Sequence, residues 1–307
     1  MNISKLHAAL VTLMLALPSL LPGGTPLLEY LFEETGTTAT NTGSLGSSAN
    51  LTFYNSSGAA TDLHSAAGSG VGGQGIAFDN TASTGSGSAG TGGRAETADA
   101  SVSTNLGALK SFTIAGWFKV DTTTTFGGGQ TRLLTVFTEP PAAETAAGIS
   151  LYGSDAGRLT LRVNGTGFTS ATAKPYYNTS SLDGQWVFFA VTYDGNQSSN
   201  NVKFYLGTET IKLTDAHTTG SIAAGSVVSS GTALTLGNNI GGSGRPFDAL
   251  FDDIRLYGST TDNSGVLSLG ELETLRAGAI PEPSTVALLA SSSLFVVAMA
   301  IRQRTRR

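Results

Sequence analysis

Short apolar runs, bounded by Gly, Asn, Asp or Ser, follow one another along most of the chain. Between residues 27 and 277 we find no long stretch with the 3.6-residue apolar spacing of a helix. Runs of this kind between turn residues are typical of β-strands. The clearest predicted strands are Leu28–Phe32, Gly75–Asp79, Phe112–Val120, Arg132–Phe137, Ile149–Tyr152, Arg158–Val163, Trp186–Tyr193, Val202–Leu206, Ile211–Thr214, Ala233–Leu236 and Phe247–Tyr257.

Many strands without intervening helices favour an all-β sandwich or barrel. One short helix is expected after Ser268, which can cap its N-terminus, with Glu271 three residues further on as in a capping box. The segments Thr35–Ser69 and Asn80–Ala100 contain few large apolar residues, so we expect long surface loops there.

Composition narrows the choice of chemistry. Gly supplies 40 of the 307 residues and charged side chains only 13%, which suits strands and turns better than helices. The chain has no Cys, which excludes disulfides and zinc–thiolate sites, and its three His make a His-based centre hard to assemble. The formal charge of −5, with no basic patch in the body of the chain, argues against nucleic acid as a partner.

The two ends read as targeting segments. Residues 1–24 resemble a secretory signal peptide, in which Lys5 precedes an apolar run from Ala8 to Leu21 and a Pro-Gly-Gly breaker. An N-terminal membrane anchor is the alternative, although the run is short for a span of about 20 residues.

The C-terminal segment, 280–307, has three parts in order. Pro281, Glu282 and Pro283 precede an apolar stretch at 285–301, and an Arg-rich end follows that would face the cytoplasm. This tail resembles the PEP-CTERM sorting signal of Gram-negative bacteria. The resemblance implies an exosortase-type sorting protease as a partner. It also implies a transient or retained inner-membrane helix and a final place at the cell surface, in the outer envelope or in the extracellular matrix. An ordinary C-terminal anchor is the alternative.

The body of the chain carries several blocks of one family in the expected order, Tyr30–Thr37, Gly75–Asp79, Ser111–Lys119, Asp183–Gly195, Val202–Leu206 and Phe247–Tyr257. They resemble the laminin-G-like, concanavalin-A-like jelly rolls. The resemblance implies a two-sheet antiparallel jelly-roll sandwich over 25–279, with a short C-terminal helix and then the terminal hydrophobic helix. Gly207-Thr208 and the long segment Asp121–Gly148 depart from the family pattern in loops where ligands would bind.

Strand parity points to one buried carboxylate. Alternation would place Asp252 on the same face as Leu250 and Ile254, which we expect to be the core face. A buried carboxylate needs a cation or several donors. One structural calcium ion would satisfy it, as in many relatives of the family, with Glu33 and Asp79 as further ligands. Hydrogen bonds to backbone amides at a bulge are the alternative.

Aromatic residues offer a second candidate site. Trp117, Trp186 and Tyr205 can share a face and stack on sugar rings, although a bulge at Gly116 would reverse Trp117. The alternative is that strands apolar on both faces are simply buried on both.

Catalytic patterns are absent. The chain contains neither the Glu-x-Asp-x-x-Glu pattern of jelly-roll glycoside hydrolases nor a Gly-x-Ser-x-Gly elbow. We therefore expect an exported, non-catalytic surface or matrix protein, not an enzyme, that binds extracellular polysaccharide or a surface protein. The alternatives are a structural matrix or biofilm component with no dedicated ligand, and a divergent polysaccharide-active enzyme.

Overall fold

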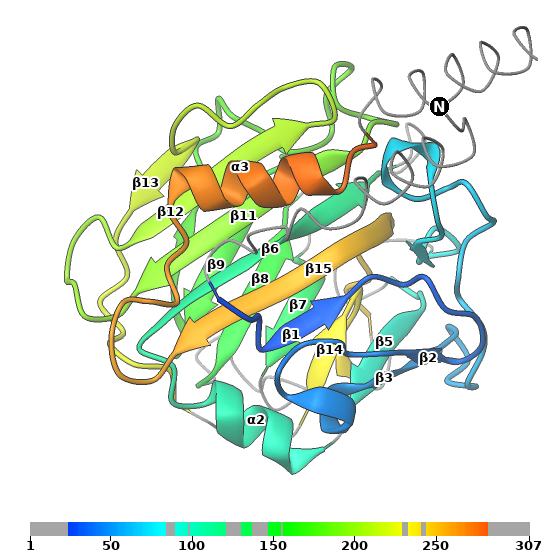
Figure 1. Ribbon diagram of the computed structural model, residues 1–307, viewed down its shortest axis with the longest axis horizontal. Helices are drawn as coiled ribbons and strands as arrows, with labels where there is room; N and C mark the ends of the chain where they lie inside the picture. The colour runs from blue at the N-terminus through cyan, green and yellow to red at the C-terminus, as the bar shows by residue number, and fades with distance from the viewer. Residues whose placement is uncertain are drawn as a thin grey trace, which may run out of the picture.

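The computed structural model describes residues 24–83, 90–97, 99–120, 130–136, 147–154, 156–228, 233–240 and 244–281. They form two antiparallel sheets packed face to face (Figure 1). Sheet A has the order β1 (Leu28–Tyr30), β15 (Leu250–Ser259), β6 (Ser111–Lys119), β11 (Val187–Asp194), β12 (Val202–Thr208) and β13 (Thr218–Gly220), and β4 (Phe78–Asp79) also pairs with β15. Sheet B has the order β10 (Thr166–Thr169), β9 (Leu159–Val163), β8 (Ile149–Gly153), β7 (Thr131–Val136), β14 (Leu234–Leu236), β5 (Arg94–Thr97), β3 (Leu51–Tyr54) and β2 (Thr38–Ala39).

The main hydrophobic core lies between the two sheets. Alternate residues of the central strands of sheet A, such as Phe118 and Phe189, belong to one buried cluster with Leu134 and Leu161 of sheet B. Period-two alternation of this kind buries one face of each sheet. The predicted two-sheet sandwich is therefore confirmed.

A third layer covers the outer face of sheet A. Helix α3 (Leu269–Gly278) lies across β11 and β12 (Figure 1), and its Leu272 is fully buried in a second apolar cluster. The predicted capping box is present, because Ser268 accepts from the Glu271 N–H while the Glu271 carboxylate accepts from the Ser268 N–H. Near the end of α3, buried Arg276 donates to the Thr208 carbonyl at 2.6 Å, which ties the helix to β12.

Strand β15 contains a bulge that corrects our parity argument. The pairing with β6 shifts between Asp252 and Arg255, and Asp253 has the left-handed φ of 51°. A bulge inserts one residue and reverses the alternation beyond it. Leu250 and Asp252 therefore face outward, toward the third layer, whereas Ile254 packs in the main core. The prediction that these three residues share the core face was wrong.

Gly116 on β6 makes room for this bulge. A Cβ on Gly116 would lie 2.5 Å from Ile254 Cδ1 and 3.1 Å from the Asp253 carbonyl oxygen, so a larger residue would displace the Ile254 side chain and crowd the bulge. The register between β6 and β11 stays regular at this point, so the irregularity belongs to β15, and Trp117 keeps its outward direction.

Partly buried ion pairs connect the bulge to the neighbouring edge strand. Arg255 donates from Nε to the Glu29 carboxylate of β1 at 2.8 Å and from a terminal nitrogen to the Asp253 carboxylate at 3.3 Å. Burial alone would raise the pKa of Glu29, but hydrogen bonds from Arg255 and Thr42 hold it below its usual value. The bulge residue thus takes part in a charge network that joins β15 to β1.

Several sequence predictions need correction. The segments expected to be long surface loops contain β2, β3 and β5, and Leu51 and Phe53 of β3 are fully buried. Residues 211–214, predicted to be a strand, have no regular structure, and β13 follows them instead. The sequence analysis also missed the short helices η1 (Gly46–Ala49), η2 (Val71–Gly73) and α2 (Ala100–Leu106) and the hairpin strand β10.

The predicted targeting segments lie almost wholly outside the described residues. Of the predicted signal peptide only Gly24 is described, and of the tail only Ile280 and Pro281 are, so Glu282, Pro283 and the hydrophobic stretch 285–301 are not. Among the helices that are described, none is long and apolar enough to cross a bilayer.

Candidate functional site

A buried carboxylate, Asp252, holds the loop that covers this part of sheet A. Its Oδ2 accepts from the Val71 N–H of η2 at 2.9 Å, and its Oδ1 accepts from the Asp253 N–H at 2.8 Å. A Cβ on Gly70 would lie 2.9 Å from Asp252 Oδ2 and would also collide with the Gln74 carbonyl oxygen, so glycine is required for this approach. Burial of Asp252, which the sequence predicted, is thus confirmed, with donors from the backbone of two segments.

The surroundings of Asp252 are unfavourable to its charge. Burial, and to a smaller extent the carboxylates of Asp253 and Glu33, raise the pKa of its carboxyl group to about 7, although the N–H groups of Val71 and Asp253 oppose the shift. Glu33 lies against Gly75 of the same covering loop. The carboxylates of Asp252 and Glu33 therefore both lie against this loop. The backbone N–H groups of Val71 and Asp253 offset part of the unfavourable charge of Asp252.

This donor set suits a hard cation. Carboxylate oxygens and backbone carbonyls such as those of Gln74 and Ile76, which crowd Gly70, are the ligand types that calcium prefers. The structure does not bring all three predicted ligands together, since among the described residues no group of three or more His, Asp or Glu is placed to hold a metal. Asp252 and Glu33 are near each other, whereas Asp79 lies in a neighbouring pocket.

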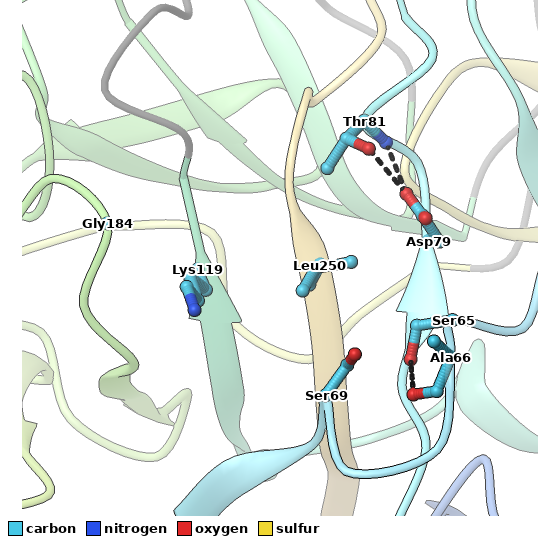
Figure 2. Close-up of a pocket in the computed structure, with 8 residues that line it drawn as sticks. All are labelled: Ser65, Ala66, Ser69, Asp79, Thr81, Lys119, Gly184 and Leu250. Carbon is cyan, nitrogen blue, oxygen red and sulfur yellow. Dashed lines mark hydrogen bonds between the residues drawn. The ribbon is translucent and has the colours of Figure 1, made fainter. Parts of the chain in front are cut away.

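That pocket has a volume of about 430 Å³ and opens beside the end of β6 and the start of β15 (Figure 2). This lies within the range of about 300–1,000 Å³ usual for ligand sites. Figure 2 shows Leu250 between Lys119 and Asp79, with Ser69 on the loop beside them. The pocket is lined by Ser65, Ala66, Ser69, Asp79, Thr81, Lys119, Gly184 and Leu250.

Hydrogen bonds fix one wall of the pocket and leave polar groups on the other. Asp79 Oδ1 accepts from the Thr81 N–H at 2.9 Å and from the Thr81 hydroxyl at 2.6 Å. Ser65 accepts from the Ala77 N–H at 2.9 Å, which closes the base of the loop. Ser69 stands one residue before Gly70, so the loop that Asp252 holds also forms the wall of the pocket.

The three predicted aromatic ligand residues do share a face, but α3 covers it. Trp117, Trp186 and Tyr205 are 0%, 4% and 6% exposed and belong to the apolar cluster that contains Leu272. Trp117 packs edge-on against Phe188 at a centroid distance of 5.3 Å. In this structure they are core residues, which is the alternative interpretation of the sequence, and a ligand could reach them only after the layer that covers them had moved away.

Pro281, the first residue of the predicted sorting motif, packs on the same covering loop. A Cβ on Gly72 would collide with the ring of Pro281, so glycine permits their close contact. The Gly72 N–H donates to the Glu209 carboxylate at 2.7 Å, which anchors η2 from the other side. The C-terminal tail therefore leaves the domain directly beside the covering loop.

The comparison with family models decides the relationship of the chain. The model described as the concanavalin A-like lectin/glucanases superfamily, of the laminin G type, matches residues 89–266, more than half of the chain. The chain belongs to this superfamily. The resemblance inferred from the sequence blocks is thereby confirmed for the sandwich domain. A comparison with curated protein sequences gives no match.

Solved structures resemble this superfamily member at low identity. The receptor-binding domain of botulinum neurotoxin mosaic serotype C/D is 10% identical, with a TM-score of 0.52, and the match covers 83% of this chain and 51% of the toxin domain. Domain 4 of an extracellular arabinanase from Geobacillus stearothermophilus, in complex with arabinotriose, is 16% identical with a TM-score of 0.41 and coverage of 82% and 98%. The chain thus spans about half the length of the toxin domain, and the likeness concerns the fold alone.

Sequence reasoning missed most of the pocket of this superfamily member. Lys119 and Leu250 lay within two different predicted strands, and Ser69 lay in a segment predicted to be a long surface loop, so their convergence depended on a strand order that was unknown. The available signal was Gly70-Val71-Gly72, because clustered glycines can mark close backbone approach. These glycines do not indicate which segment approaches them, and only the order of the strands in the sheet identifies that segment.

We predict that Trp117→Ala destabilises the protein because Trp117 is core. Truncation of a buried Trp should lower the free energy of unfolding by about 3–5 kcal/mol, measured by chemical denaturation. Ile211→Ala is the control, since Ile211 is 54% exposed and its truncation should change stability by about 0.5 kcal/mol or less. An unchanged stability with loss of ligand binding would instead support the aromatic platform.

Proposed function

We propose that this chain is an exported, non-catalytic protein whose sandwich domain binds carbohydrate or a surface protein outside the cell. The observation that carries the proposal is the open 430 Å³ pocket, in which charged and hydroxyl side chains surround the apolar Leu250. Such a mixture of apolar and convergent polar groups is typical of ligand sites. Membership of a superfamily named for lectins and glucanases supports carbohydrate as the first class of ligand to test.

Binding without catalysis is supported by the composition of the pocket. Glycoside hydrolysis commonly uses two carboxylates about 5–10 Å apart on either side of the scissile bond. Among the described residues that line this pocket, Asp79 is the sole carboxylate, and one of its oxygens is engaged by Thr81. The pocket can therefore hold a sugar more readily than it can cleave one.

The test is affinity electrophoresis of the full chain, in mild detergent, through gels that contain neutral or acidic polysaccharides, together with capture on surface proteins. We expect retardation by at least one ligand. Ala66→Trp, which fills the pocket, should abolish it, whereas Ala67→Trp on the adjacent residue outside the lining should not. Equal retardation of both variants would place binding elsewhere, and no binding to any ligand would favour a structural matrix component.

We also propose that a calcium ion supports the Asp252 loop. Asp252 and Glu33, together with backbone carbonyls of the covering loop, would bind this ion. Asp79 would not be a ligand of the ion, because it lines the neighbouring pocket. When bound, the ion would supply positive charge beside this pair of carboxylates. Asp252 would then orient the loop through both the Val71 N–H and the ion.

Calcium should raise the melting temperature of chelator-treated protein by several degrees at millimolar concentration, because a ligand that binds only the folded state stabilises it. Asp252→Asn and Glu33→Gln should remove this response, and Glu34→Gln should retain it, since Glu34 instead accepts from the Thr40 N–H. An identical melt with chelator and with calcium in the unmodified protein would contradict the proposal.

Export and surface sorting complete the proposed function. They are supported by the order of Pro281, Glu282 and Pro283, the apolar stretch and the Arg-rich end. The partner would be an exosortase-type protease, and the terminal helix would lie in the inner membrane before or instead of cleavage. The charged C-terminal end would keep that helix in place by remaining in the cytoplasm.

Replacement of Pro281, Glu282 and Pro283 by Ala should trap the full-length chain in the inner membrane, because the helix is kept while the recognition motif is lost. Cell fractionation and the size of the mature chain measure this. Deletion of residues 280–307 is the control that should release the chain instead. Surface delivery of the triple variant at the normal level would support an ordinary anchor.

A further inference from the structure

We propose that the pocket recognises an acidic sugar unit, with the Lys119 ammonium on the sugar carboxylate and Asp79 on its hydroxyl groups. This inference rests on the proposed carbohydrate-binding function and names the chemical class of its ligand. It starts from the three residues at the centre of the pocket, Asp79, Leu250 and Lys119 (Figure 2).

Strand register places the two charges on either side of Leu250. Leu250 pairs directly with Asp79 of β4 and with Lys119 of β6. Directly paired residues project from the same face, and neighbouring strands are about 4.8 Å apart, so the Asp79 and Lys119 backbones are about 10 Å apart. That separation accommodates one sugar ring between a cation and a carboxylate.

The side chains of Lys119 and Asp79 do not form an ion pair with each other. Within the described part of the chain, neither Lys119 nor Asp79 takes part in an ion pair. Both Thr81 donors bind Asp79 Oδ1, which leaves Oδ2 to accept from a ligand. The Ser65 hydroxyl donates to the Ala66 carbonyl and accepts from the Ala77 N–H. By contrast, no described residue forms a hydrogen bond with the Ser69 hydroxyl.

The chemistry of these groups selects the ligand. An ammonium only donates and a carboxylate only accepts, so Lys119 calls for an anion and Asp79 for hydroxyl donors. A neutral sugar leaves Lys119 without a counter-charge, and a simple carboxylic acid leaves Asp79 without a donor. A uronate carries both groups on one ring, and its C–H face can lie on the apolar Leu250.

The test compares galacturonate and glucuronate oligosaccharides with their methyl esters, by calorimetric titration of the full chain in mild detergent. The esters keep the ring and lose the charge. We expect the acid to bind about tenfold more tightly than the ester, and Lys119→Met to reduce the acid to the level of the ester. Asp79→Asn should weaken both ligands, because both present the same hydroxyl groups.

Lys203→Met is the matched control, since Lys203 is an exposed lysine of the same sheet outside the pocket lining. It should leave the affinity for the acid unchanged, and all variants should melt near the temperature of the unmodified protein. Equal affinities for acid and ester would overturn the inference. So would acid binding that is insensitive to Lys119→Met.

The remaining outcomes separate this inference from the proposed function. Binding of a neutral polysaccharide with no uronate binding would overturn the inference and leave carbohydrate binding in place. Lys119-dependent binding of an oligoglutamate peptide without uronate binding would overturn it in favour of an acidic protein partner. A chain that binds no carbohydrate and no surface protein would overturn both.

Discussion

One additional residue in β15 determines which side chains serve the core and which serve the site. Because Asp253 adopts a left-handed conformation, the alternation of the strand reverses there. Leu250 and Asp252 consequently face outward, where one contributes to the pocket and the other holds the covering loop, while Ile254 returns to the core. The space over Gly116 and the ion pairs of Arg255 make this irregularity compatible with tight packing.

The loop 65–76 connects two features that would otherwise be separate. Its Val71 end is held by Asp252, and its Ser69 side forms a wall of the pocket. The carboxylate that positions the wall lies in surroundings that raise its pKa to about 7, so whatever compensates its charge also affects the shape of the pocket. Asp252 therefore supports a wall of the pocket, while α3 and this loop together bury the aromatic face of sheet A.

The sandwich and its C-terminal helix could be predicted because β6, β11 and α3 carry long, regular patterns and a capping box. Strands β3 and β5 could not be predicted, because each has only four residues and lies in a Gly/Ser-rich segment. They are stabilised by the strands with which they pair, and the local sequence pattern does not reveal those strands. Burial of Asp252 followed from its apolar neighbours, but its face did not, because a non-glycine residue at positive φ leaves no mark in the sequence. The pocket depended on strand order, which local patterns do not contain.

The contact between Pro281 and Gly72 also fixes the point at which the C-terminal tail leaves the domain. Ser69 and Gly72 are three residues apart, so the wall of the pocket begins within about 11 Å of the point where the tail departs. Under the proposed attachment through residues 285–301, the pocket would therefore lie close to the point where the tail leaves the domain. Under that proposal, the length of chain between Pro281 and the bilayer would limit how thick a polymer strand could reach the pocket.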